Sequence, residues 1–146
     1  MCFVCGLQNL AGLKLAFYED PEAGQVRAEF TVPDEYQGYP GVVHGGIIAA
    51  VLDEVSGRAV LIRGSEEDLM ATLKITIRYR RPTPTGTPLT AVGWVERMGG
   101  MGARVAGEIR LPDGTVTAEC ESVLVHPPQE FFDQWEAEKP YWKVYE

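Results

Sequence analysis

Hydrophobic and polar residues alternate along two segments near the start of the chain, with the period of two that half-buried strands show. The apolar positions are Leu13, Leu15 and Phe17 in the first segment, and Val26, Ala28, Phe30 and Val32 in the second. The segment between them, residues 19–24, has the Asp, Pro and Gly composition of a turn. The pattern therefore predicts a β-hairpin.

The hydrophobic period changes after residue 44. Residues 33–43 contain prolines and glycines and predict a loop, whereas Gly45–Arg63 contains no proline. Apolar residues recur within that second segment at helical spacing, at Ile48, Val51, Leu52, Val55, Ala59 and Ile62. The segment predicts the single long helix in the body of the domain.

Four more segments with strand patterns follow this helix. In the first, the residues predicted to face the helix are Ala71, Leu73, Ile75, Ile77 and Tyr79. The other three are residues 89–97, 101–111 and 115–126, which turn signals separate. Two strands, one helix and four antiparallel strands make an α+β domain. We predict a hotdog fold, a curved antiparallel sheet of about six strands wrapped around one long central helix.

The predicted helix has a second face made almost entirely of small residues. Nearly opposite the apolar stripe, at about 100° per residue, lie Gly46, Ala49, Ala50, Asp53 and Gly57. A solvated helix face normally carries Lys, Glu or Gln rather than Gly and Ala. Small residues indicate that a partner backbone or a ligand approaches closely. We therefore interpret Asp53 as a catalytic carboxylate, and Glu54, which looks away from this face, as a structural or solvated acid.

The start of the same helix offers a complementary feature in His44-Gly45-Gly46. The first backbone N–H groups of a helix have no internal partners and lie at the positive end of its dipole. Such donors could polarise the carbonyl of a bound substrate and stabilise the oxyanion that develops upon attack. Asp53, two turns further along the helix, could activate a water or attack the acyl carbon itself.

The sequence His44-Gly45-Gly46 followed by Asp53 resembles the active-site helix of hotdog thioesterases, in the branch of PaaI-type enzymes and human thioesterase-superfamily members. Residues 36–43 and the N-terminal Cys-Phe-Val-Cys-Gly also resemble this branch, so the resemblance covers about residues 2–126. It implies an enzyme that hydrolyses an acyl-CoA thioester to free acid and coenzyme A. Coenzyme A is part of the substrate, and no separate cofactor is implied.

The resemblance also assigns roles to the residues of this motif. Asp53 would be the general base or the nucleophile. Gly45 would supply an oxyanion-hole N–H, with Gly46 nearby, and His44 would shape the loop or contact the thioester. Family members work as dimers or tetramers with their sites at subunit interfaces, so a homodimer or homotetramer is implied.

One further position matches a family feature, and another departs from the family pattern. Family members often add a Ser or Thr from a strand of the opposing subunit, and Thr72 occupies the matching position. The alternation of residues 71–79 points Thr72 away from the helix unless a bulge re-aims it. Some relatives carry an Asn about six residues before the His, where this chain has Gly38, with Gln37 beside it as a substitute.

Positive charge is concentrated at Arg78, Arg80 and Arg81. Arginine pairs well with phosphate oxygens, so these residues are candidates to bind the phosphates of coenzyme A. The alternative is a solvated strand face that balances an acidic surface. The whole chain carries a net charge of −8, from 21 acidic and 13 basic residues, which argues against nonspecific nucleic-acid binding.

The three cysteines are an odd number and argue against a disulfide framework. Cys2 and Cys5 have the spacing of half a zinc site, but such a site needs four ligands. The sequence offers Cys120, His44 and His126 to complete it, and His44 is already assigned to the helix start. We therefore predict no metal site, and cysteines that pack structurally near the N-terminus.

The domain is expected to cover residues 1–126 and to be followed by an aromatic-rich strap, residues 127–146. The aromatic residues of the strap predict a short helix packed on the domain or on a neighbouring subunit. No apolar run approaches the ~18 residues of a membrane span, and the N-terminus lacks the pattern of a signal peptide. We expect a cytoplasmic protein with no membrane partner.

Two other functions fit the same fold. A hotdog dehydratase or hydratase usually pairs a His with an acid at a different spacing. A non-catalytic acyl-CoA-binding or regulatory module could use the same cleft. Asp53 favours catalysis, because a carboxylate beside an anionic ligand gives a pure binder no advantage.

Overall fold

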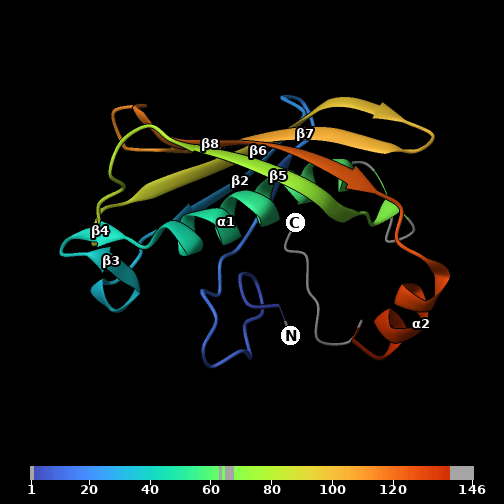
Figure 1. The fold of residues 1–146 in the computed structure, drawn as a ribbon, viewed down its shortest axis with the longest axis horizontal. Helices are drawn as coiled ribbons and strands as arrows, with labels where there is room; N and C mark the ends of the chain where they lie inside the picture. The colour runs from blue at the N-terminus through green and yellow to red at the C-terminus, as the bar shows by residue number, and fades with distance from the viewer. Residues whose placement is uncertain (1, 63, 65–67, 139–146) are drawn as a thin grey trace.

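A six-stranded antiparallel sheet packs on one long helix in this computed structural model, which describes residues 2–62, 64 and 68–138 (Figure 1). The strands are β1 (Tyr18–Asp20), β2 (Gln25–Phe30), β5 (Ala71–Tyr79), β6 (Leu89–Gly99), β7 (Gly102–Arg110) and β8 (Val116–Val125). Their order across the sheet is β1-β2-β6-β7-β8-β5, which makes β5 an edge strand. The predicted α+β class and hotdog fold are confirmed.

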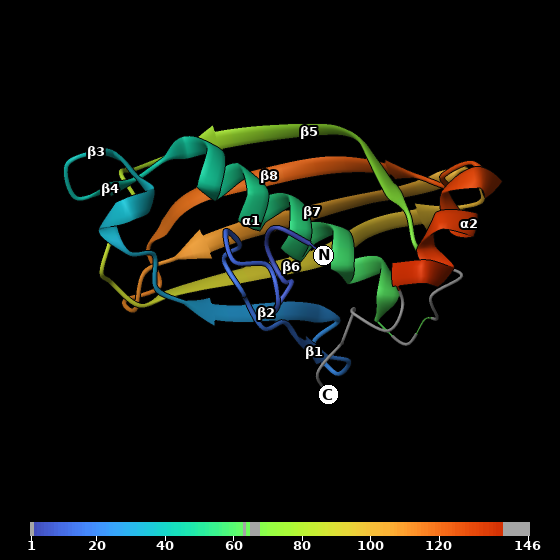
Figure 2. The ribbon, with the colours of Figure 1, turned by 90° about the horizontal axis from the view of Figure 1, so that it is seen from below.

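Helix α1 (Gly45–Arg58) crosses one face of this sheet (Figure 2). Its predicted apolar stripe is correct, since Ile48, Val51, Leu52 and Val55 are all fully buried. A 3₁₀ turn, Ala59–Leu61, continues the chain. The α-helix therefore ends earlier than predicted, and Arg63 lies outside the described residues.

Strand β6 passes α1 at very close range. A Cβ atom added to Gly93 would lie only 2.6 Å from the carbonyl carbon of Val55. It would also lie 3.0 Å from the Cα of Ser56. Glycine at position 93 is thus what allows the sheet and the helix backbone to meet.

The first predicted strand is shorter than its alternation suggested. Lys14 has a φ of 56°, in the left-handed region, which interrupts an extended strand. The backbone N–H groups of Leu13 and Leu15 donate to the carbonyls of Phe3 and Val4 instead, at 2.8 and 2.9 Å. Strand pairing with β2 therefore begins only at Tyr18, although the predicted hairpin is present.

The predicted loop, residues 33–43, contains a 3₁₀ turn (Asp34–Tyr36) and a small two-stranded sheet, β3 (Gln37–Tyr39) and β4 (Val42–Val43). Two backbone hydrogen bonds of 2.9 Å fix the entry into α1. Val43 N–H donates to the carbonyl of Thr83, and His44 N–H donates to that of Tyr36. The loop therefore holds the first turn of α1 in a defined position.

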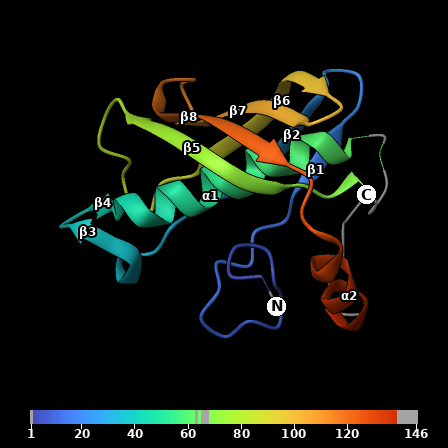
Figure 3. The ribbon, with the colours of Figure 1, turned by 45° about the vertical axis from the view of Figure 1, so that its right-hand side comes forward.

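The N-terminal segment, residues 2–12, lies on the side of α1 away from the sheet (Figures 1 and 3). After β8, helix α2 (Gln129–Glu138) follows, and the rings of Phe131 and Phe132 meet edge to face in it. Tyr141, Trp142 and Tyr145 lie outside the described residues. No helix in the described part of the chain is long and apolar enough to cross a membrane.

Candidate active site

Asp53 lies half-buried in the middle of α1, on the face made of small residues. Its Oδ1 atom accepts a hydrogen bond from the Thr72 hydroxyl at 2.8 Å. The bond joins α1 to edge strand β5, and both residues belong to the same chain. It brings together two of the residues singled out from the sequence.

A β-bulge in β5 explains why Thr72 reaches Asp53. In the ladder with β8, Thr72 pairs with Leu124, but Lys74 pairs with Val123, so Leu73 is an extra residue. Leu124 is buried on the helix side of the sheet, and residues directly opposite each other share a face. Thr72 therefore faces α1. The prediction that Leu73 faces the helix is wrong, since its side chain is 68% exposed.

His44 caps the first turn of α1. Its Nδ1 atom accepts the backbone N–H of Gly46 at 2.9 Å. That N–H is therefore engaged by His44. The sequence had suggested Gly46 as an oxyanion donor, but its N–H is not free for this role in the structure. The N–H of Gly45 has no acceptor among the described residues and keeps the donor role open.

Tyr79, at the end of β5, holds the same helix start. Its hydroxyl donates to the carbonyl of Gly45 at 2.8 Å. The ring also packs 3.4–3.6 Å from where a Cβ of Gly45 would lie. Strand β5 thus contacts α1 at both ends, through Thr72 and through Tyr79. The alternation of residues 71–79 places Tyr79 only in the sheet, because a strand pattern carries no signal of a helix contact through a hydroxyl.

Gln37 and Gly38 both shape the loop around His44. The Gln37 side-chain oxygen accepts the backbone N–H of Gly41 at 3.0 Å and so closes the turn between β3 and β4. A Cβ on Gly38 would lie 3.3 Å from the Cα of His44 and 3.4 Å from its ring. In this structure the two residues therefore support His44 rather than face Asp53.

The profile of the thioesterase superfamily matches residues 40–118, just over half of the chain. The chain belongs to the thioesterase superfamily. The matched segment contains His44, Gly45, Asp53 and Thr72. The resemblance noted from the sequence is thereby confirmed.

Three relatives illustrate this membership. The chain is 28% identical over 82 residues to acyl-coenzyme A thioesterase THEM4 from Rattus norvegicus, covering 56% of this chain and 34% of that protein. The solved thioesterase superfamily protein RHA08564 is 35% identical, with a TM-score of 0.78 over 85% of this chain and 59% of its own. A putative thioesterase from Ralstonia eutropha, a phenylacetic acid degradation-related protein, is 26% identical, with a TM-score of 0.68 over 77% and 85%. This chain thus spans about a third of the rat protein and three fifths of RHA08564.

The three arginines predicted to bind the phosphates of coenzyme A do not lie beside Asp53 in the single chain. Arg80 donates to the Glu119 carboxylate at 2.6 Å, and Arg78 lies 3.9 Å from it. Glu119 lies between two buried, helix-facing residues of β8, so it and its arginines occupy the opposite face of the sheet. The hydrogen bond from Arg80 lowers the pKa of the Glu119 carboxyl. The side chain of Arg81 is exposed, and its backbone N–H donates to the carbonyl of Thr117.

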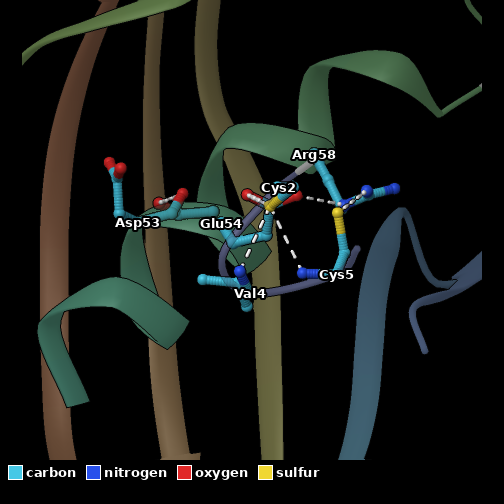
Figure 4. Close-up of polar contacts among 7 residues, drawn as sticks. Cys2, Val4, Cys5, Asp53, Glu54 and Arg58 are labelled. Atoms are coloured by element: carbon cyan, nitrogen blue, oxygen red, sulfur yellow. Dashed lines mark hydrogen bonds and ion pairs between the residues drawn. The ribbon is translucent and has the colours of Figure 1, made fainter. Parts of the chain in front are cut away.

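A second polar cluster, in which the N-terminal cysteines meet α1, lies on the other side of this helix (Figure 4). It comprises Cys2, Cys5, Glu54 and Arg58. Arg58 Nε donates to Glu54 at 2.8 Å, which makes Glu54 the structural acid that was predicted. The Cys5 thiol, with the backbone N–H groups of Cys5 and Val4, lowers the pKa of Cys2 to about 7. The sequence carried two signals for this cluster, the Cys-x-x-Cys spacing of Cys2 and Cys5 and the i, i+4 spacing of Glu54 and Arg58.

Proposed function

We propose that this protein hydrolyses an acyl-CoA thioester to the free acid and coenzyme A. The hydrogen bond from Thr72 to Asp53, on a helix face of glycines and alanines, is the observation that carries the proposal. It orients the carboxylate through Oδ1 and leaves Oδ2 without a partner among the described residues. Membership of the thioesterase superfamily and the activity named for the rat relative support the same chemistry.

In the proposed reaction, Asp53 takes a proton from a water while the water oxygen attacks the thioester carbon. The Gly45 N–H donates to the oxygen that becomes negatively charged. The C–S bond then breaks, the proton passes to the departing sulfur, and the free acid and coenzyme A leave. If Asp53 attacked the thioester directly, an anhydride would form at residue 53. Borohydride added during turnover would trap this anhydride as a mass change in the peptide that contains Asp53, and the water route predicts no such change.

One chain does not bring both groups to one thioester. Gly45 and Asp53 are eight positions apart on the helix, which is about 12 Å along its axis. The base and the oxyanion donor must each lie within about 3 Å of the reacting group. The proposal is therefore that Asp53 and Thr72 of one chain act with Gly45 of the partner subunit in a homo-oligomer.

The surface around β5 supports this assembly. An edge strand presents unpaired backbone groups, and β5 also exposes Leu73 and Tyr79, which are 68% and 54% accessible. A shallow hollow of about 430 Å³ lies elsewhere, against Phe30 of β2 and Leu89 of β6, on the part of the sheet away from β5. It contains neither Asp53 nor Thr72, so it is not the site proposed here.

Leu73→Glu is expected to shift the protein towards monomer and to reduce acyl-CoA hydrolysis at the same protein concentration. Burying a charge at a subunit contact without a partner is costly. Size-exclusion chromatography with light scattering measures the assembly. Leu10→Glu is the matched control, because Leu10 is 95% exposed in the N-terminal segment. Equal oligomer distributions for the two variants would contradict a contact at β5.

Thr72→Val is expected to lower kcat by about 10-fold or more, with little change in KM, whereas Thr72→Ser retains most of the activity. Valine keeps the shape of threonine but cannot donate to Asp53, so the carboxylate loses its orienting hydrogen bond. Steady-state kinetics of the two variants provide the comparison. If Thr72→Val and Thr72→Ser have the same kcat, the hydroxyl is not part of the site.

The proposed function itself is tested with a panel of short, long and aromatic acyl-CoA thioesters, by following free thiol release. Hydrolysis of at least one class is expected. Binding is measured in parallel with a non-hydrolysable thioether analogue. Binding without hydrolysis would make the protein an acyl-CoA-binding module. Water addition to an enoyl-CoA, without thiol release, would make it a hydratase.

A further inference from the structure

Two separate parts of the chain place three potential metal ligands side by side. Cys2 and Cys5 come from the N-terminal turn, and Glu54 comes from α1 (Figure 4). One sulfur from each cysteine and one oxygen of Glu54 all lie within 4.8 Å of one another. We propose that this group binds a divalent cation of the zinc class. The inference does not depend on the proposed thioesterase reaction.

The separation of the Cys2 and Glu54 ligand atoms suits a tetrahedral ion. The Cys2 sulfur lies 3.6 Å from Oε2 of Glu54. A zinc ion at about 2.3 Å from a thiolate and about 2.1 Å from a carboxylate oxygen sets those two atoms roughly 3.6 Å apart. An ion could therefore be accommodated with little movement of either side chain.

The N-terminal turn also prepares Cys2 to bind as a thiolate. The backbone N–H groups of Val4 and Cys5 donate to its sulfur at 3.3 and 3.2 Å. Such N–H donors stabilise negative charge on a ligating sulfur and hold it in place. Gly6 is needed to close this turn, because a Cβ there would collide with the backbone carbonyl oxygen of Cys2.

The two oxygens of Glu54 have different partners. Oε1 accepts Arg58 Nε at 2.8 Å, which leaves Oε2 facing Cys2. Arg58 Nη2 also donates to the Cys5 sulfur at 3.1 Å, so one guanidinium orients two of the proposed ligands. Once both cysteines bind as thiolates, the three ligands carry three negative charges, which the divalent cation and the neighbouring guanidinium of Arg58 offset.

Glu54 is a third ligand in addition to the sequence candidates Cys120, His44 and His126. Cys120 is buried elsewhere and donates to the carbonyl of Leu52, and His44 caps α1. Cys2 and Glu54 are only half-buried, so the fourth position of the ion is open to a water. Two thiolates favour zinc over magnesium or calcium. Asp53 points away from the cluster (Figure 4), so the ion would fasten the N-terminal segment to α1 and would not contact the thioester.

The experiment uses the full chain without a purification tag, expressed with added zinc, purified with a reductant and dialysed against metal-free buffer. Elemental analysis is expected to find about one zinc per chain. Replacement by cobalt(II) is expected to give the visible bands of a tetrahedral ion and a near-ultraviolet thiolate-to-cobalt band. Cys2→Ser, Cys5→Ser and Glu54→Gln should each weaken binding by roughly 100-fold or more, beyond what loss of an outer partner does. Cys120→Ser, which removes the remaining thiol, should leave binding unchanged.

Absence of bound zinc together with absence of the thiolate-to-cobalt band in the wild-type protein would overturn the proposal. So would an equal loss of binding in Cys120→Ser. Recovery of Cys2 and Cys5 as a disulfide, two hydrogens lighter, from zinc-supplemented protein would show a redox pair instead. If a cysteine variant does not fold, the cobalt spectrum of the wild type and the metal affinity of Glu54→Gln still test whether the site binds an ion. Thiol release from acyl-CoA, measured separately on the zinc-bound wild type, tests the proposed hydrolysis independently.

Discussion

Asp53→Asn is expected to lower kcat/KM for acyl-CoA hydrolysis by at least about 100-fold, the size of effect seen for a general base. An amide can neither take the proton from a water nor attack the acyl carbon. It can still accept the hydrogen bond from Thr72 through its oxygen, so the fold should be retained. Free thiol release by the two proteins, with thermal unfolding as a check of folding, measures the effect.

Glu121→Gln is the matched control for this variant. It also neutralises one carboxylate, but Glu121 is exposed on the strand face away from α1. Its activity should stay within about twofold of the wild type, because surface substitutions away from a site have small effects. If Asp53→Asn keeps kcat and only raises KM, Asp53 contributes to substrate binding and the catalytic role is wrong.

Gly93→Ala is expected to reduce the free energy of unfolding by about 3 kcal/mol or more. The added methyl group would be forced into the backbone of Val55 and Ser56, which is part of a helix and cannot move like a side chain. Urea unfolding followed by circular dichroism gives the midpoint and slope for each protein.

Gly99→Ala provides the comparison within the same strand. Gly99 also lies in β6, but a Cβ there would meet nothing within 4 Å. Its effect should stay within about 0.5 kcal/mol. If both variants lost the same stability, the cost would come from the strand backbone rather than from the contact between β6 and α1.

The fold could be predicted from periodicity wherever one face of an element packs on the core. The stripe of Ile48, Val51, Leu52 and Val55 is buried as its helical spacing indicated. Periodicity failed where a single backbone conformation decides the outcome. The left-handed Lys14 shortened the first strand, and the extra Leu73 reversed the side that Thr72 faces. Neither conformation has a signature in the hydrophobic pattern.

The candidate site was predictable only in part for a similar reason. Asp53 stood out because its neighbours on the helix are unusually small, and this local property is readable from a sequence. The contacts of Gly45 with Tyr79, and of Cys2 with Glu54, join residues 34 and 52 positions apart. Such contacts depend on how the sheet and the N-terminal segment fold onto α1. One sequence without related sequences contains no record of these pairings.

The bulge at Leu73 makes the position of Thr72 depend on residue count as well as on residue type. In a regular strand, a shift of the pairing by one residue turns each side chain to the opposite face. If β5 straightened with Leu73 retained, Leu73 would stand opposite Leu124 and the Thr72 hydroxyl would turn to the solvent side, while every chemical group stayed in the chain. Deleting Leu73 would instead leave a regular ladder in which Thr72 still pairs with Leu124 and still faces α1. In an alignment of this superfamily, a gap at Leu73 is therefore compatible with the pair of Asp53 and Thr72, whereas a regular strand that keeps a residue there is not.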